Sequence, residues 1–339
     1  MTKTSITKAC DKINPPATGE ILLDEKDGKE RPWQKHKEAT HALQEIYNRL
    51  GFTSKAGRVA VCGTFLEFLR YVKEATMKLH RANFCKVRLC PMCAWRRSLK
   101  IFGQVKQVMD FAMSEQKYRF IFLTLTVENC RGEDLSAEID QLMQGFHRMF
   151  RLAQIKKSVK GWFRALEVTH NLDPNSPSYD TYHPHFHVIL MVNPSYFTDT
   201  RRYISQKKWT SLWRESMRLD YTPIVHVTTV KPSKEKSMNG IIAEVAKYTA
   251  KSNEYLLENK ELATKTVAIL DAALANRRLA AFGGRMKEIH KLLNMDDAED
   301  GDLIRTDNEE TPGGEDYVVE QYSWHIGYKQ YFRVPGKGD

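Results

Sequence analysis

The stretch YHPHFHVILMV, Tyr182–Val192, combines three histidines at alternating positions with an unbroken apolar run. Side chains alternate between the two faces of a β-strand, so His183, His185 and His187 project to the same side. The apolar run predicts a strand buried within a sheet. Because imidazole is a common metal ligand, the pattern favours a divalent-metal site on a rigid strand over a solvent-exposed row of histidines.

Other segments place this strand in a mixed fold. Strands are predicted at 118–129, 161–171, 185–192 and 223–230. Helical spacing predicts helices at 33–50, 64–85, 96–116, 135–155, 205–219, 237–258 and, in two pieces around Gly283–Gly284, 263–294. Residues 317–334 alternate like a hairpin around Gly327. Periodicity alone leaves open a parallel sheet and an α+β domain with an antiparallel sheet.

Composition limits the classes of protein to consider. The 339 residues carry a formal net charge of +10, and a basic balance favours, without proving, a nucleic-acid partner. No apolar run approaches the roughly 20 residues that span a bilayer, and the N-terminus lacks the pattern of a secretory signal. We therefore expect a cytoplasmic protein with no membrane partner.

Glu167 is the first candidate for a third metal ligand. It lies between apolar residues of the predicted strand 161–171, where an unpaired charge would be unfavourable. A metal ion would neutralise it, and so would a salt bridge. His183 ranks second, behind Glu167. Pro184 can distort the start of the strand and turn His183 away from the metal.

A cysteine cluster precedes the predicted sheet. Cys85, Cys90 and Cys93 have Cys-x₄-Cys-x₂-Cys spacing, and His80 is the nearest candidate for the fourth ligand of a tetrahedral Zn²⁺ site. A structural zinc ion and a reduced thiol cluster both remain open. Zinc would brace AWRRSLK (94–100), whose arginines are candidates for contacts with DNA phosphates. The other cysteines are interpreted as ordinary thiols; they are Cys10, Cys62 and Cys130.

The segment AEVAKYTAKSNEY (243–255) contains a third group of reactive side chains. On a helix, Glu244, Tyr248 and Lys251 would project from one face. A phenol, a carboxylate and an ammonium together suit covalent phosphoryl transfer. A boundary tyrosine with ordinary surface charges is the alternative interpretation.

Taken in order, these motifs resemble a known family. FLTLTVEN (122–129), HPHFHVIL (183–190) and EVAKYTAK (244–251) resemble the three motifs of rolling-circle plasmid replication initiators, the Rep proteins of the HUH endonuclease superfamily. CKVRLCPMCAWRRS (85–98) resembles their cysteine segment. The resemblance covers roughly residues 85–255. It implies an α+β HUH domain, a central antiparallel β-sheet flanked by helices, with helical N- and C-terminal additions.

The resemblance also implies roles for individual residues. His185 and His187 would bind Mg²⁺ or Mn²⁺, and Tyr248 would attack single-stranded DNA to give a 5′-phosphotyrosine link and a free 3′-OH. Glu244 would assist the terminating hydrolysis, and Lys247 or Lys251 would hold phosphate. The implied partners are plasmid origin DNA, including duplex beside the nick site, and the host helicase and polymerase. A homodimer is left open.

These inferences predict four parts. Residues 1–32 form a flexible arm, 33–116 a helical, Cys-containing DNA-binding region, 117–258 the nicking and joining domain, and 259–339 C-terminal helices, an acidic linker and a terminal hairpin. A further basic segment, 201–216, is also a candidate for origin contacts.

Two alternatives remain. One is a conjugative relaxase or transposase of the same superfamily, although the absence of a G-x₄-G-K-[ST] motif favours a stand-alone initiator. The other is a non-enzymatic, zinc-containing DNA-binding regulator, which would leave His185, His187 and Tyr248 without a role.

Overall fold

The computed structural model describes residues 19–26, 28–73, 76–230, 235–247, 249–306 and 316–335. The chain forms two compact units, each with its own sheet. One unit comprises Met1–Arg96 and Leu303–Asp339, and the other Arg97–Asp302. The boundary between them falls within helix α4 (Pro91–Gln116).

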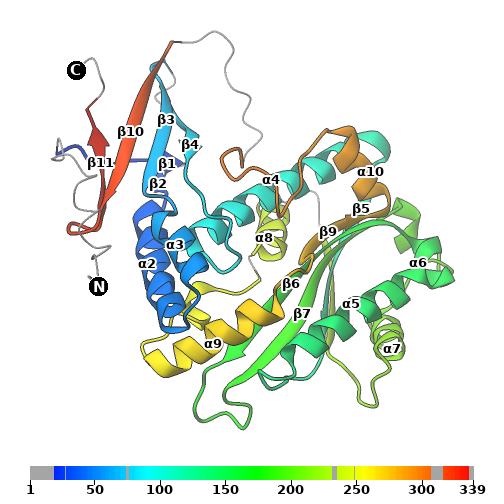
Figure 1. The fold of residues 1–339 in the computed structure, drawn as a ribbon. Helices are drawn as coiled ribbons and strands as arrows, with labels where there is room; N and C mark the ends of the chain where they lie inside the picture. The colour runs from blue at the N-terminus through cyan, green and yellow to red at the C-terminus, as the bar shows by residue number, and fades with distance from the viewer. Residues whose placement is uncertain are drawn as a thin grey trace. The chain divides into compact units, whose positions relative to one another are not determined.

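The unit Arg97–Asp302 contains a five-stranded sheet in the order β8-β5-β7-β6-β9 (Figure 1). Every neighbouring pair in it is antiparallel. The α+β class is therefore confirmed, and the parallel alternative is excluded. The strands are β5 (Arg119–Thr126), β6 (Val159–Asn171), β7 (Thr181–Val192), β8 (Val225–Val230) and β9 (Ala280–Gly283).

Strand β7 lies in the middle of this sheet because it is apolar on both faces. Phe186, Val188 and Leu190 are fully buried on one face, and Ile189 and Met191 are fully buried on the other. Such a strand is stable only with layers above and below it. The alternation places His185 and His187 on the same face as Ile189 and Met191.

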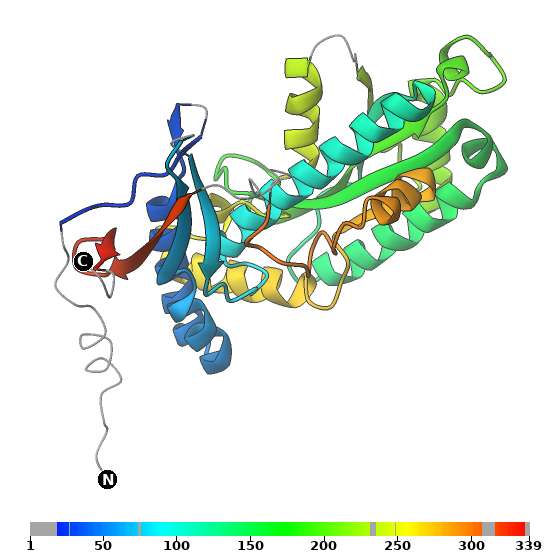
Figure 2. The same ribbon diagram turned by 90° about the horizontal axis from the view of Figure 1, so that it is seen from above.

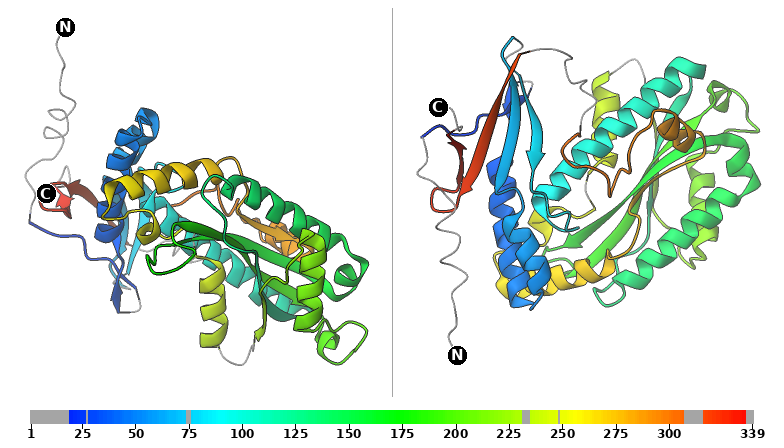
Figure 3. Two further views of the ribbon diagram at one scale, coloured as in Figure 1. Left: turned by 90° about the horizontal axis from the view of Figure 1, so that it is seen from below. Right: turned by 45° about the horizontal axis from the view of Figure 1, so that its top comes forward.

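Helices cover both faces of the sheet (Figures 1 and 3). On the histidine face, residues of α4, α8 and α10 share one apolar core with the sheet, including Val105, Ile242 and Met286. On the opposite face, Phe146 of α5 packs edge-on against Phe186 at 5.4 Å. The helices of this unit other than α4 are α5 (Leu135–Arg151), α6 (Ala153–Ser158), α7 (Gln206–Met217), α8 (Glu235–Val245), α9 (Lys260–Ala273) and α10 (Gly284–Leu292), with 3₁₀ turns η1 (Pro194–Phe197) and η2 (Ser252–Glu254).

The other unit joins segments that are distant in sequence (Figure 2). Its four-stranded sheet has the order β11-β10-β3-β4, so the C-terminal hairpin pairs with β3. The predicted hairpin around Gly327 is confirmed. The elements are β1 (Glu25–Lys26), β2 (Lys29–Glu30), α2 (Trp33–Arg49), α3 (Thr53–Val61), β3 (Phe65–Tyr71), β4 (Thr76–Ala82), β10 (Tyr317–His325) and β11 (Gln330–Val334).

The predicted helix at 64–85 is wrong. This segment forms β3 and β4, which are antiparallel neighbours, and β10 binds the other edge of β3. Its apolar residues suit a helix as well as a strand. Pairing with β10, about 250 residues away, is a non-local interaction that local spacing cannot reveal.

Smaller differences concern where a predicted element ends and which short elements form. Helix α8 ends at Val245, whereas the sequence predicted a helix to 258. Strand β9 lies where two consecutive helices were expected, and α3 was not predicted. In the predicted arm, the amide of Leu22 donates to Tyr331 O (3.1 Å), so the described part of the arm is anchored to β11.

Among the described residues, no helix combines the length and apolar character needed to cross a membrane.

Candidate metal centre and its surroundings

The register of the sheet brings three potential ligands together. In the β6–β7 ladder, Glu167 lies directly opposite His185, and residues opposite each other in an antiparallel pair project from the same face. His187 is two residues further along that face. One ligand atom from each of Glu167, His185 and His187 lies within 4.8 Å of the others.

Hydrogen bonds orient both imidazoles toward the carboxylate. His185 Nδ1 lies 3.0 Å from His183 O, and because a carbonyl oxygen can only accept, Nδ1 carries the proton. His187 Nδ1 contacts Thr124 Oγ1 at 3.4 Å. The Nε2 atoms then face Glu167 Oε2, at 3.6 Å from His185 and 2.8 Å from His187. An Nδ1 held by a hydrogen bond, with Nε2 directed toward the position of the metal, is the usual arrangement of a metal-binding histidine.

Glu167 is a buried charge with several partners. Its exposed fraction is 4%, and besides the imidazoles it contacts Lys251 Nζ through Oε1 at 3.0 Å. Burial alone would raise the pKa of the Glu167 carboxyl, but the neighbouring His187, Lys251 and His185 side chains together hold it well below its usual range. The carboxylate is therefore ionised and able to bind a cation.

Three side chains from the end of α8 and the segment after it lie around this centre. Glu244 Oε1 is 4.0 Å from His187 Nε2, and Lys247 forms an ion pair with the other oxygen of Glu244. The Glu167 carboxylate outweighs burial and raises the pKa of Lys251. Because α8 ends at Val245, these residues converge from a helix end and the chain beyond it, not from one helical face as the sequence predicted. Tyr248 lies outside the described residues.

His183 stands beside the centre. Its ring stacks on that of His185 at 5.0 Å, and it does not belong to the group of atoms within 4.8 Å. Burial, together with the neighbouring His185, lowers the pKa of His183.

A set of contacts that the sequence did not predict attaches the segment 249–254 to β6. The amide of Val168 donates to Thr249 O (2.6 Å). His170 Nδ1 lies 3.2 Å from Glu254 O, and its Nε2 lies 2.9 Å from Asp180 Oδ1. Lys265 of α9 contacts the other Asp180 oxygen at 2.6 Å. Among these residues, only His170 could have been singled out from the sequence, because it is a histidine at the end of a predicted strand.

The cysteine cluster contains a different fourth residue from the one predicted. Cys62, which the sequence interpretation treated as an ordinary thiol, has its sulfur within 4.8 Å of those of Cys85, Cys90 and Cys93. His80 instead points from β4 toward Glu67, 4.0 Å from its Oε1, with a half-exposed side chain. The sequence feature that could have indicated Cys62 is its position as a further cysteine upstream of the other three.

The arginines of AWRRSLK do not face solvent. Arg96 and Arg97 are 1% and 5% exposed. Arg96 Nε donates to Leu303 O (2.9 Å), and Arg97 Nε donates to Glu299 O (3.0 Å). The suggestion that they contact DNA phosphates is therefore wrong. They hold residues 299–304, part of the predicted acidic linker, against α4.

Comparison with known proteins gives a consistent result. A family described as "Replication protein" matches residues 76–332. A "Protein rep" of Bacillus amyloliquefaciens is 40% identical over 334 residues, covering 91% of this chain and 96% of the relative. A "Protein rep" of Streptococcus pneumoniae serotype 2 is 42% identical over 324 residues, covering 94% and 97%. A "Replication protein" of Staphylococcus aureus is 38% identical over 231 residues, covering 67% and 95%. No solved structure matches the chain.

Proposed function

The chain belongs to the Rep family of rolling-circle plasmid replication proteins, and from this premise we propose that it initiates replication by nicking one strand of the plasmid origin. The observation that carries the proposal is the convergence of Glu167, His185 and His187 on one face of a rigid sheet. Glu244, Lys247 and Lys251 surround them. This is the arrangement expected of an HUH endonuclease domain.

Glu167, His185 and His187 fit a divalent cation. Two imidazole nitrogens and an ionised carboxylate oxygen form a mixed nitrogen and oxygen donor set, for which we propose Mg²⁺ or Mn²⁺. Bound there, the cation would act as a Lewis acid for a phosphodiester oxygen. The apolar strand behind the histidines keeps the two rings in place.

Tyr248 is the proposed nucleophile. Its phenolate oxygen forms a bond to phosphorus while the bond from phosphorus to the 3′ oxygen breaks. The 5′ phosphate is then linked to the tyrosine, and the 3′ oxygen takes up a proton to become a primer for the host polymerase. Lys247 precedes Tyr248 in the chain and contacts Glu244, and Thr249 follows it and is hydrogen-bonded to Val168.

Glu244 and the lysines complete the proposed mechanism. Glu244 has a 39% exposed side chain beside His187, so water and DNA can reach it. It would accept the proton of the water or 3′-hydroxyl that resolves the phosphotyrosine link. Lys251 and Lys247 carry positive charge that offsets the charge of the phosphate. Single-stranded DNA and adjacent duplex are the proposed substrates, and a host helicase the proposed partner.

The proposal is tested with single-stranded oligonucleotides carrying the plasmid's own nick site, incubated with Mn²⁺. We expect a covalent protein–DNA adduct from the wild type and from Tyr255→Phe, and none from Tyr248→Phe. His187→Ala should bind the oligonucleotide without cleaving it. His226→Ala is the matched control, because His226 lies opposite Thr124 on β8 as His187 does on β7.

An undiminished adduct in Tyr248→Phe would contradict the assigned nucleophile. Origin binding without cleavage by the wild type would favour the non-enzymatic regulator. Cleavage of an origin of transfer in preference to the replication origin would favour the relaxase alternative.

A further inference from the structure

We propose that Cys62, Cys85, Cys90 and Cys93 bind one structural Zn²⁺ ion as a tetrahedral tetrathiolate site. All four are buried, with exposed fractions between 0% and 9%. They belong to the unit that contains the C-terminal hairpin, whereas the candidate metal centre at Glu167 belongs to the other unit. The proposal therefore concerns a second metal ion with a different role and does not depend on the nicking mechanism.

The spacing of the sulfur atoms fits a single ion. The Sγ atoms of Cys62 and Cys93 are 3.5 Å apart, those of Cys62 and Cys90 3.6 Å, and those of Cys85 and Cys93 3.7 Å. A tetrahedral ion with Zn–S bonds of about 2.3 Å places its sulfur ligands about 3.8 Å apart. Bonded sulfurs would be only about 2.05 Å apart. The distances match ligands of one small cation, and an iron–sulfur cluster would hold the cysteines further apart.

Backbone amides surround the sulfurs as they do in metal–thiolate sites. The amide of Cys85 donates to Cys62 Sγ at 3.3 Å, and the amide of Lys86 donates to Cys93 Sγ at 3.3 Å. A third bond runs from the amide of Val87 to Cys85 Sγ at 3.4 Å. Lys86 adopts a left-handed conformation, φ 56°, which turns these amides inward. Such hydrogen bonds stabilise thiolates, the form that binds metal.

The start of α4 and Lys37 supply positive potential. Cys90 directly precedes the first residue of α4, and Cys93 lies in its first turn, where the helix dipole favours negative charge. Lys37 of α2 is fully buried and donates from Nζ to Cys62 O (2.7 Å) and Ala60 O (3.1 Å). Four thiolates around Zn²⁺ carry a net charge of −2, which the neighbouring ammonium partly offsets. Lys37 is thus a positioning residue for the site.

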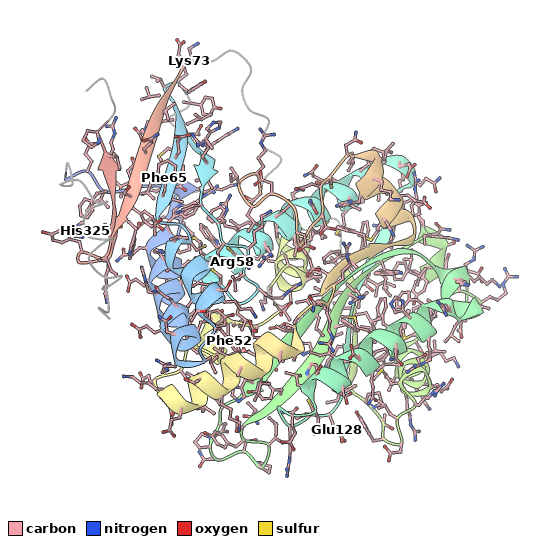
Figure 4. The ribbon with its side chains drawn as sticks, viewed as in Figure 1. Phe52, Arg58, Phe65, Lys73, Glu128 and His325 are labelled. Carbon is pink, nitrogen blue, oxygen red and sulfur yellow. The ribbon has the colours of Figure 1, made fainter. Side chains whose placement is uncertain are left out.

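The proposed ion would join three elements of this unit. Cys62 caps the end of α3, Cys85 follows β4, and the remaining two ligands lie at the start of α4. Arg58 of α3, labelled in Figure 4, adds a bond from Nη2 to Cys85 O at 2.5 Å. The ion would fix α3 relative to the β3–β4 hairpin, which is the role of a structural zinc in a small domain.

The test is metal analysis of the full chain purified without chelators. We expect one zinc per chain in the wild type, in His80→Ala and in Cys130→Ser, and a substoichiometric amount in Cys62→Ser. After exchange into Co²⁺, the wild type should show the visible absorption of tetrahedral cobalt with thiolate ligands. Cys62→His should keep the metal and shift that absorption, because one sulfur ligand becomes nitrogen. Lys37→Met should release zinc to a chelator about 10-fold faster, with Lys35→Met unchanged.

Several outcomes would overturn the proposal. They are a metal-free wild type that Zn²⁺ does not stabilise, iron in place of zinc, or loss of zinc in His80→Ala with retention in Cys62→Ser. If Cys62→Ser does not fold, the Cys62→His spectrum decides alone: an absorption identical to that of the wild type would exclude Cys62 as a ligand.

Discussion

Glu167 is the residue on which the candidate metal centre depends most. Both Nε2 atoms of the histidine pair face its Oε2, and Lys251 contacts its Oε1. A carboxylate with an exposed fraction of 4% is stable in this place only because these partners compensate its charge. Glu244 differs, since its side chain is 39% exposed and 4.0 Å from His187 Nε2. The two glutamates should therefore have separable roles.

Substitution of each glutamate by glutamine tests this separation. We expect Glu167→Gln to weaken Mn²⁺ binding by about 100-fold, because it removes a charged ligand. Glu244→Gln should bind Mn²⁺ within a few-fold of the wild type and accumulate the covalent DNA adduct, because hydrolysis is slowed. Electron paramagnetic resonance measures Mn²⁺ affinity, and denaturing gels measure the adduct. Equal loss of affinity in both variants would contradict the assignment.

For individual residues, the sequence predicted the arrangement of the histidines better than that of their neighbours. The alternation around Phe186 is a local property of a strand, so it placed His185 and His187 on one face correctly. Glu167 was the first candidate for a third ligand, and the register of β6 against β7 places its carboxylate beside the two imidazoles. Cys62 could not be assigned from spacing, because its proximity to Cys85 arises from the packing of α3 against the end of β4.

Among the elements, the segment 249–254 shows how the chain beside the proposed nucleophile is attached to the sheet. It is fixed to the edge of β6 by the amide of Val168 and by His170, whose ring also stacks on Tyr182 at 4.4 Å. Both ring nitrogens of His170 face oxygen acceptors. Because Lys251 lies in this segment and reaches Glu167, His170 is expected to set the position of Lys251.

Removal of the His170 ring should impair catalysis more than DNA binding. We expect His170→Gly to lower kcat for nicking by about 10- to 100-fold with little change in KM, because a small displacement of reacting groups has effects of that size. Added imidazole should restore part of the rate by filling the space left by the ring. His290→Gly, another partly buried histidine of the same unit, should show no rescue. A rate that imidazole does not change would contradict this role.

The pairing of β10 with β3 includes a charged contact that should make stability depend on pH. Arg70 donates to both Glu320 oxygens, at 2.7 and 2.9 Å, and Tyr322 donates a third bond. Burial alone would raise the pKa of Glu320, but Arg70 and Tyr322 lower it. A carboxyl whose pKa is lower in the folded state stabilises the fold above its unfolded value of about 4.3. That contribution is lost as the pH falls through the folded value.

Glu320→Gln should therefore lower the free energy of unfolding by about 1–2 kcal/mol at neutral pH. The difference from the wild type should shrink as the pH falls from about 5 toward 3, because the wild type then loses the same charge. Urea unfolding at several pH values measures this difference in the free energy of unfolding. Glu45→Gln, on the surface of α2, is the control. A difference that does not change with pH would show that the ion pair is not its cause.

The elements that the sequence predicted wrongly have a common physical cause. The segment 64–85 has helical spacing, but β3 is stabilised by pairing with β10 from the far end of the chain. The helix expected to reach 258 ends at Val245, and the chain beyond it is bonded to β6 instead. In both cases a non-local hydrogen-bonded edge outweighs local propensity. Helices α2, α5 and α7 were predicted closely because their amphipathic spacing is local.

At the scale of the whole molecule, one unit is completed by the end of the chain and the other is continuous in sequence. Every residue placed in or around the candidate metal centre lies in Arg97–Asp302. The sheet of the other unit, in contrast, depends on β10 and β11. The two functions proposed for the chain, metal-assisted nicking and a zinc-braced fold, therefore belong to different units.

Substitution of Tyr331 tests whether one unit can be destabilised without loss of the metal centre in the other. It is fully buried, donates to Gly63 O at 2.6 Å and packs against Trp324 at 4.9 Å. We expect Tyr331→Ala to destabilise its unit by about 3–5 kcal/mol, as aromatic truncations in cores do, and Tyr328→Ala, 71% exposed, to have almost no effect. Hydrogen exchange should rise in β3 and β10, while Mn²⁺ affinity at His185 and His187 stays within about threefold of the wild type. Loss of Mn²⁺ binding together with the protection of β3 would mean that the metal centre needs the C-terminal hairpin, because its ligands would then be held in place only when both units are folded.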